Sequence, residues 1–287
     1  MVILSKCSDS KQNLPETVKI EEAFSVEQMA KKAKASLKRE EICLDDFEGI
    51  YTKEKIEADK KYVEEKEKVF DRDDTENEKE MKKLATIFEV VVYKHGELSE
   101  WFGHGALTIK TSEYDDIKNG VDLMVEFEEK GHLALAIDVT FSNDTEKKFE
   151  RIQKEIEKGK LTEVEYFKSE SEEYPHSLQK VPRVVIGAEK KTVMELGELW
   201  VENEKEKLGK HSIQFQMLDQ IIEQAEVFAE YARKCKKEDV VGQYENIRKI
   251  LGDVLKEKNK NPDLEDSFER DNVHYSIIEK AKSFKNF

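Results

Sequence analysis

Apolar side chains recur every three or four positions along most of this chain. The most regular series lies in residues 212–236, where it runs from Leu218 to Cys235 and predicts a helix with one buried face. Only four prolines and twelve glycines interrupt the chain, so the pattern indicates a helix-rich protein. The same spacing predicts further helices over residues 25–39, 53–70, 240–258 and 272–284.

The pattern changes after Lys82. A wide apolar helical face ends near Gly96 and is followed by extended runs. The run at residues 133–141 is almost continuously apolar, which is typical of a strand buried on both faces. A helix that ends at Gly159, a further strand and another helix complete the order α-β-β-β-α-β-α, which predicts an α/β core. The four expected strands cover residues 106–111, 121–128, 133–141 and 182–188.

These elements divide the chain into three segments. We expect a helical extension over residues 1–78, an α/β core over residues 79–208 and carboxy-terminal helices over residues 209–287. The acidic, polar stretch 71–80 separates the first two segments and is typical of a linker or a frayed helix end.

The charge balance opposes an evident nucleic-acid surface. The 287 residues include 64 acidic and 49 basic side chains, which gives a formal net charge of −15. Each of the stretches 1–81, 82–168 and 169–287 is net negative and repels phosphate at long range. A nucleic-acid partner therefore requires bound cations or a local basic patch, such as the one from Lys31 to Arg39.

Composition also bears on location. No apolar run reaches the roughly 18 residues that a membrane-spanning helix needs, and the first residues lack a secretory signal pattern. The cysteines Cys7, Cys43 and Cys235 are too widely spaced to predict a zinc cluster or a disulfide framework. We therefore expect a cytoplasmic protein without a membrane partner.

Two acidic residues stand where strands are expected. Asp138 lies between Ile137 and Val139 in the most apolar run, and a buried carboxylate needs a charge partner. If the turn between the second and third strands is centred near residue 130, positions whose numbers sum to about 260 lie opposite one another. Asp122 then lies opposite Asp138. Two adjacent carboxylates repel, and a divalent cation such as Mg²⁺ or Mn²⁺ removes that repulsion.

These residues resemble the motif of the PD-(D/E)xK nuclease superfamily. The resemblance rests on GVD at residues 120–122 and IDVT at residues 137–140, with a helix before and after the strands, and covers about residues 80–200. It implies a restriction-endonuclease-like core with additional amino- and carboxy-terminal helices. It also implies hydrolysis of phosphodiester bonds in DNA or RNA with Mg²⁺ or Mn²⁺.

The resemblance assigns roles to individual residues. It implies that Asp122, Asp138 and the backbone carbonyl of Val139 bind the metal, and that Glu89 on the first helix assists them.

One position departs from the superfamily pattern. The lysine expected two residues after the second acid is Thr140 here, and a hydroxyl does not supply positive charge to a transition state. Some superfamily members carry that lysine on the next helix, where this chain has Lys147 and Lys148. Lys148 lies four residues before Ile152, which faces the core, so Lys148 is the preferred candidate.

The acidic assignments have structural alternatives. Asp122 would be common in a turn, and Asp138 could form a structural ion pair with Arg183 or a helix lysine. Glu89 could instead face solvent.

The remaining polar candidates also have alternatives. Lys147 and Lys148 could instead belong to a solvated helix start. Asp115 and Asp116 could be ordinary loop residues rather than residues that assist a metal. Gln153 could face the site or be a surface amide. His104 could act as a base or be only a loop residue.

Two functions of different classes follow. The first is a divalent-metal-dependent nuclease that uses Glu89, Asp122, Asp138 and Lys148. The second is a catalytically inactive nuclease-like scaffold that binds a protein partner through its terminal helices. The missing strand lysine and the acidic charge favour the second, whereas the opposed acid pair favours the first.

Overall fold

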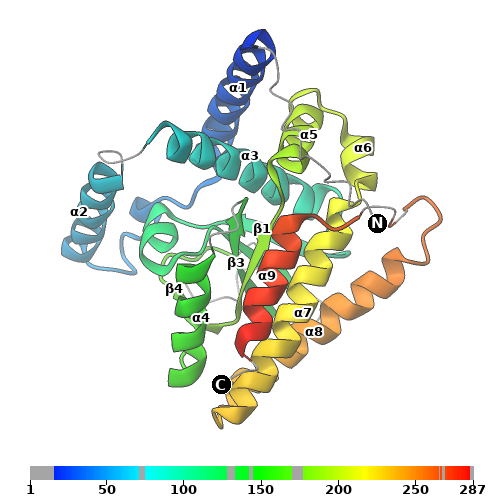
Figure 1. Ribbon diagram of the computed structural model, residues 1–287. Helices are drawn as coiled ribbons and strands as arrows, with labels where there is room; N and C mark the ends of the chain where they lie inside the picture. The colour runs from blue at the N-terminus through cyan, green and yellow to red at the C-terminus, as the bar shows by residue number, and fades with distance from the viewer. Residues whose placement is uncertain are drawn as a thin grey trace, which may run out of the picture.

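A four-stranded mixed sheet lies at the centre of the protein, with helices around it (Figure 1). The computed structural model describes residues 16–70, 75–127, 133–141, 145–169, 177–264, 266 and 269–284. The strand order is β1-β2-β3-β6, in which the first three strands are antiparallel and β6 runs parallel to β3. The strands are β1 (Ala106–Lys110), β2 (Leu123–Phe127), β3 (Leu133–Thr140) and β6 (Arg183–Gly187).

The strands occur in the predicted order. The sheet and its flanking helices follow the sequence α3-β1-β2-β3-α4-β6-α5, with one addition that the hydrophobic pattern did not indicate. This addition is a two-stranded antiparallel sheet between α4 and β6, formed by β4 (Thr162–Val164) and β5 (Leu178–Val181). The helices of this part are α3 (Glu76–Leu98), α4 (Glu146–Lys158), α5 (Lys190–Val201) and α6 (Lys205–Lys210).

The register between β2 and β3 agrees with the prediction. Leu123 pairs with Ile137, and these numbers have the expected sum. Asp122 directly precedes β2, and its backbone N–H donates a hydrogen bond of 3.1 Å to the carbonyl of Ile137. The paired register ends at Leu123, and this bond places Asp122 against β3 beside Ile137, the residue before Asp138. The turn at residues 128–132 lies outside the described residues.

The two faces of the sheet are buried by different elements. On one face, strand residues such as Val125 and Leu135 share a hydrophobic cluster with Ile87 and Val91 of α3. On the other face, alternate residues such as Ala136 pack with β4 and β5. Because both faces are covered, the central strands are apolar at nearly every position, as is typical of strands inside an α/β core.

The free edge of the sheet is capped by glutamine side chains. β6 is an edge strand, and Gln224 of α7 (Ile213–Lys234) accepts a hydrogen bond of 2.9 Å from Val185 N–H and donates one of 2.7 Å to Val185 O. Gln220 bonds the N–H and carbonyl of Gly187 in the same way, at 3.0 and 2.9 Å. These buried amides satisfy backbone groups that would otherwise pair with another strand.

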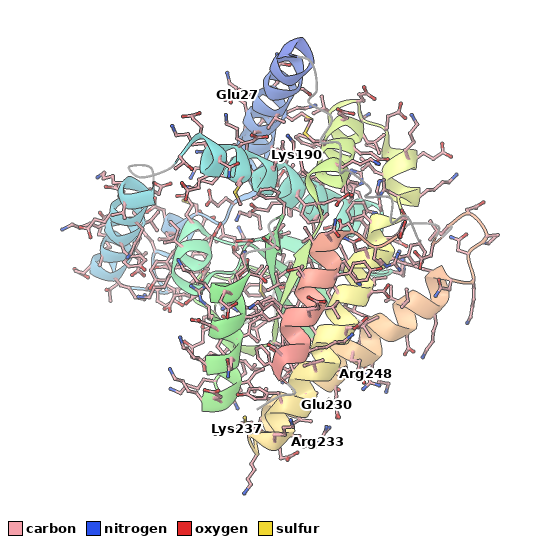
Figure 2. All side chains as sticks on the ribbon, in the orientation of Figure 1. Glu27, Lys190, Glu230, Arg233, Lys237 and Arg248 are labelled. Atoms are coloured by element: carbon pink, nitrogen blue, oxygen red, sulfur yellow. The ribbon has the colours of Figure 1, made fainter. Side chains whose placement is uncertain are left out.

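The terminal helices pack on the core. α1 lies along α3 and contacts α5, and ion pairs link Glu27 to Lys83 and Lys190 to Glu80 (Figure 2). α7, α8 and α9 pack side by side, and α7 and α9 also contact β6 (Figure 1). One hydrophobic cluster includes residues of α1, α3, the central sheet and α7 to α9. The elements not yet given are α1 (Glu16–Glu40), η1 (Leu44–Phe47), α2 (Lys53–Phe70), α8 (Glu238–Lys258) and α9 (Asn272–Ser283).

The segment boundaries fall near helix ends. The expected boundary after residue 78 lies in the first turn of α3, and the one after residue 208 lies within α6. The expectation that residues 71–80 form a linker or frayed end is wrong for residues 76–80. Thr75 and Glu78 form a capping box that starts α3 at Glu76. None of the helices in the described part of the chain is long and apolar enough to cross a membrane.

Candidate active site

Charged side chains gather where the central strands and their connecting segment meet α3 and α4. The connecting segment is η2 (Asp115–Asn119), a π-helical turn between β1 and β2. Four carboxylates and two ammonium groups share this region, which we call the acid–lysine cluster. Its members are Glu89, Lys110, Asp116, Asp122, Asp138 and Lys148.

Asp138 is paired with the lysine on α4. Only 7% of the Asp138 side chain is exposed, and its Oδ1 atom contacts Nζ of Lys148. The same ammonium donates a hydrogen bond of 3.1 Å to the carbonyl oxygen of Val139. Asp138 Oδ1 and Val139 O therefore converge on one cation. Arg183, the other partner considered for Asp138, binds Glu155 at 2.9 Å instead.

Asp122 approaches the same residue from the neighbouring strand. Its Oδ2 atom accepts a hydrogen bond of 2.7 Å from the backbone N–H of Val139. The backbone N–H of Val139 thus contacts Asp122, and its carbonyl contacts Lys148. The position after Gly120 is turn-like, but the Asp122 carboxylate bonds across to β3 rather than to its own turn.

Glu89 belongs to the cluster and does not face solvent. Its Oε1 atom lies 2.9 Å from Nζ of Lys110, whose side chain is 7% exposed at the end of β1. Lys110 also lies 3.1 Å from Asp116 Oδ2 and 3.2 Å from the carbonyl of Asp122. The buried Oε1 atom of Glu89 is therefore paired by charge with Lys110.

The excess of carboxylates determines the protonation of the cluster. Dehydration of the Asp122 carboxyl, together with repulsion from Asp116 and Asp138, raises its pKa well above the ordinary value of 3.8. Burial also raises the pKa of Glu89, although Lys110 opposes this effect.

The two lysines remain cations. Burial acts to lower the pKa of Lys110, but Glu89 and Asp116 outweigh it and raise this pKa well above 10.5. Burial likewise opposes the effects of Asp138 and Asp122 on Lys148, and the net result is a raised pKa. Four carboxylates facing two ammonium groups leave two negative charges uncompensated if every group is ionised.

Arg183 and Gly120 hold the segment that carries Asp122. The buried guanidinium of Arg183 donates hydrogen bonds of 2.7 Å to Gly120 O and 2.6 Å to Asn119 O. Gly120 has a φ of +65°, and a Cβ atom at this position would overlap the guanidinium of Arg151. Glycine is therefore required here both by backbone conformation and by the close approach of an arginine.

Replacing Gly120 with alanine is expected to destabilise the protein by about 1–3 kcal/mol, because a non-glycine residue with positive φ is strained and the new methyl group displaces Arg151. Gly242 provides a matched control. It lies within α8 with no atom near its added Cβ, so Gly242→Ala should stabilise by about 0.5–1 kcal/mol. Urea unfolding of both variants tests this, and changes of the same sign would contradict it.

Other candidates from the sequence lie outside the cluster. Asp115 is fully buried and accepts hydrogen bonds from the backbone N–H groups of Glu165 and Tyr166, so its role is structural. Gln153 bonds Glu157 and Tyr231.

His104 also has a different environment. It pairs with Glu100 at 2.9 Å and lines a separate cavity of about 480 Å³ with Lys258. Lys147 is exposed and forms no ion pair with a described residue, in contrast to Lys148.

The donor atoms suit a hard divalent cation. Asp122, Asp138 and the Val139 carbonyl provide only oxygen, which Mg²⁺ and Mn²⁺ prefer. The convergence of two of these donors on an ammonium marks a point that favours positive charge. In the described part of the chain, no group of three or more His, Cys, Asp or Glu side chains is arranged as a metal site. A bound metal would therefore use the backbone carbonyl and displace Lys148 from Asp138.

Comparisons with protein-family models, with curated proteins and with solved structures found no match for this chain. The functional argument therefore depends on the geometry of the cluster.

Two buried basic residues in or near the acid–lysine cluster were not expected from the sequence. Lys110 ends an alternating strand, where a lysine is typical of a solvated strand end, and Arg183 was considered only as a partner for Asp138. Arg183 lies in an otherwise apolar segment, and this is the one signal that could have indicated its burial, whereas Lys110 is followed by Thr111 and Ser112 and gave no such signal.

Proposed function

We propose that this protein is a divalent-metal-dependent nuclease with a restriction-endonuclease-like core that hydrolyses phosphodiester bonds of DNA or RNA. The observation that carries the proposal is the convergence of Asp138 Oδ1 and Val139 O on one cation beside Asp122. The excess of two carboxylates over ammonium groups in the cluster supports the same conclusion, since a divalent cation supplies two positive charges.

Asp122, Asp138 and the carbonyl of Val139 would hold the metal. When bound, Mg²⁺ or Mn²⁺ supplies a water molecule of lowered pKa and neutralises charge on the scissile phosphate. The hydrogen bond from Val139 N–H fixes one oxygen of Asp122 and leaves the other carboxylate oxygen for a ligand.

Lys148 would provide the positive charge that Thr140 lacks. Because its pKa is raised, it is an ammonium at neutral pH and does not accept a proton from water. Its function is then electrostatic: it stabilises negative charge that develops on the phosphate oxygens. Its side chain is 29% exposed, so it reaches both the buried Asp138 and the solvent side of the site.

Lys110 and Glu89 would maintain the geometry of the site. Lys110 binds the carbonyl of Asp122 directly and is held by Glu89 and Asp116. It is more deeply buried than Lys148, so we assign it a positioning role rather than contact with substrate.

The alternative, an inactive scaffold for a protein partner, has less support. Lys148 contacts Asp138, so a cation is within reach of the acid pair despite the absence of a strand lysine. The large apolar side chains that are exposed in the described residues are dispersed over separate elements and do not form a docking face. They are Ile50, Val69, Leu98, Val201 and Tyr275.

The proposal is tested by incubating the purified protein with single-stranded DNA, duplex DNA and RNA in Mg²⁺, Mn²⁺ or EDTA. We expect cleavage of at least one substrate with either metal and none in EDTA. The Asp138→Asn variant, prepared in parallel, should show none and controls for contaminating nucleases. If no substrate is cleaved in either metal, the nuclease is rejected and the inactive scaffold is favoured.

A further inference from the structure

A basic cleft runs along α4 beside the acid–lysine cluster. It has a volume of about 570 Å³ and is bounded by α4, the end of η2 and the segment that leads into β4. Seven basic and three acidic side chains line it, although the whole protein has a net charge of −15. The cleft is therefore a local reversal of the overall charge.

Five of these cations lie within ion-pair distance of no carboxylate in the described part of the chain. They are Lys118, Lys147, Arg151, Lys158 and Lys160, which are all exposed. Arg151 also acts electrostatically on Glu155 without forming an ion pair with it. Lys154, in contrast, lies 3.6 Å from Glu150. Most of the positive charge of these five side chains is thus available to an external anion.

Residues that line the cleft are close neighbours of residues in the candidate active site. Lys147 directly precedes Lys148, and the Arg151 guanidinium lies against Gly120, two residues before Asp122. Lys158 lies eleven residues after Lys147 on the same helix, or about 17 Å along its axis. At the far end of α4, the side chain of Lys237 approaches Gly159 (Figure 2).

We propose that this cleft binds the phosphodiester backbone of the strand cut at the acid–lysine cluster, without reading base sequence. The inference rests on the proposed nuclease function and adds the position of the substrate on the protein. Flexible lysine and arginine side chains contact phosphate regardless of sequence. Leu161 is the one large apolar residue among those lining the cleft, so the surface does not fit an apolar protein segment.

The test compares two double variants that remove equal charge. Lys158→Gln/Lys160→Gln alters the cleft, and Lys31→Gln/Lys34→Gln alters exposed lysines on α1. Fluorescence anisotropy measures binding of labelled single-stranded DNA, duplex DNA and RNA in EDTA over a range of salt concentrations. The cleft variant should bind about tenfold more weakly, and its salt slope should fall by about 1.8 on duplex DNA or 1.4 on single strands. The α1 variant should match the wild type within about twofold.

The outcomes separate the two proposals. Equal affinity of both double variants, or a poly-glutamate competitor that binds as well as the oligonucleotides, would overturn the assignment of the cleft even if the protein cleaves nucleic acid. Cleft-dependent binding without cleavage in any metal would reject the nuclease and retain the nucleic-acid site.

Discussion

Replacing Lys148 with alanine is expected to lower kcat about 100- to 1,000-fold, the range measured when one group that stabilises transition-state charge is removed. Lys148 is the one cation that contacts both Asp138 and the Val139 carbonyl in the described residues. Its raised pKa keeps it charged, so its loss removes an electrostatic contribution that Thr140 cannot replace. Steady-state cleavage rates at saturating Mg²⁺ measure the effect, and added ethylamine should restore part of the activity.

The adjacent lysine is the matched control. Lys147 has the same side chain and precedes Lys148 on α4, but it is exposed and forms no hydrogen bond or ion pair with Asp138 or Val139. Lys147→Ala should leave kcat within about threefold of wild type and raise KM, since Lys147 lines the basic cleft. Equal losses of kcat in the two variants, or no amine rescue of Lys148→Ala, would contradict the assigned role.

Replacing Asp122 with asparagine should abolish activity, lowering kcat by at least about 1,000-fold, and at the same time stabilise the metal-free protein. Dehydration and two neighbouring carboxylates raise the pKa of Asp122, so its ionisation opposes folding. An asparagine oxygen can still accept the hydrogen bond from Val139 N–H. Stability and catalysis therefore change in opposite directions at this residue.

The stability gained by Asp122→Asn should depend on pH. Because the folded-state pKa of Asp122 lies above its unfolded value, the folded protein holds more protons between the two values, and wild-type stability falls as pH rises through that window. The asparagine variant lacks this fall. The advantage of the variant should be small near pH 4 and should grow above it, by about 1.4 kcal/mol for each unit by which the pKa is raised.

Asp115 provides the control for the change in stability, because it is also a buried aspartate and lies in η2, just before Asp122. Its two oxygens accept hydrogen bonds from Ser112, Asn119 and two backbone N–H groups, so it has no acceptor to spare. Asp115→Asn should destabilise by about 1–3 kcal/mol, because the amide places a donor against other donors. Urea unfolding between pH 4 and pH 8 compares the two variants. Stabilisation by both, or by neither, would contradict the account of the cluster.

Local periodicity accounts for much of the fold. The strand at residues 133–140 has a continuous apolar pattern because both of its faces are covered, and this pattern was sufficient to identify it. The helix at Lys53–Phe70 was predicted with its observed bounds. The pairing of Leu123 with Ile137 was also predictable, since a short turn leaves few alternative registers.

Features that depend on tertiary contacts were not predictable. Gln220 and Gln224 stand between residues of the apolar series of α7, and nothing in their spacing indicates that they cap β6. β4 and β5 are too short for periodicity to identify them.

The candidate site also contains one residue that was predictable from the sequence and one that was not. Helical phase distinguished Lys148 from Lys147, because Lys148 lies one turn before the buried Ile152. Lys110 gave no such signal, since its contacts with Glu89 and Asp116 form only when α3 and η2 pack against the end of β1.

The most direct test of the account is calorimetric titration of the metal-free protein with Mn²⁺, in the wild type and in Asp138→Asn. If Asp122, Asp138 and Val139 O form the metal site, the wild type binds one Mn²⁺ with release of protons, and the variant binds at least about tenfold more weakly. Equal affinity in the two proteins, or no binding by the wild type, would contradict the central claim that these strands hold a divalent cation.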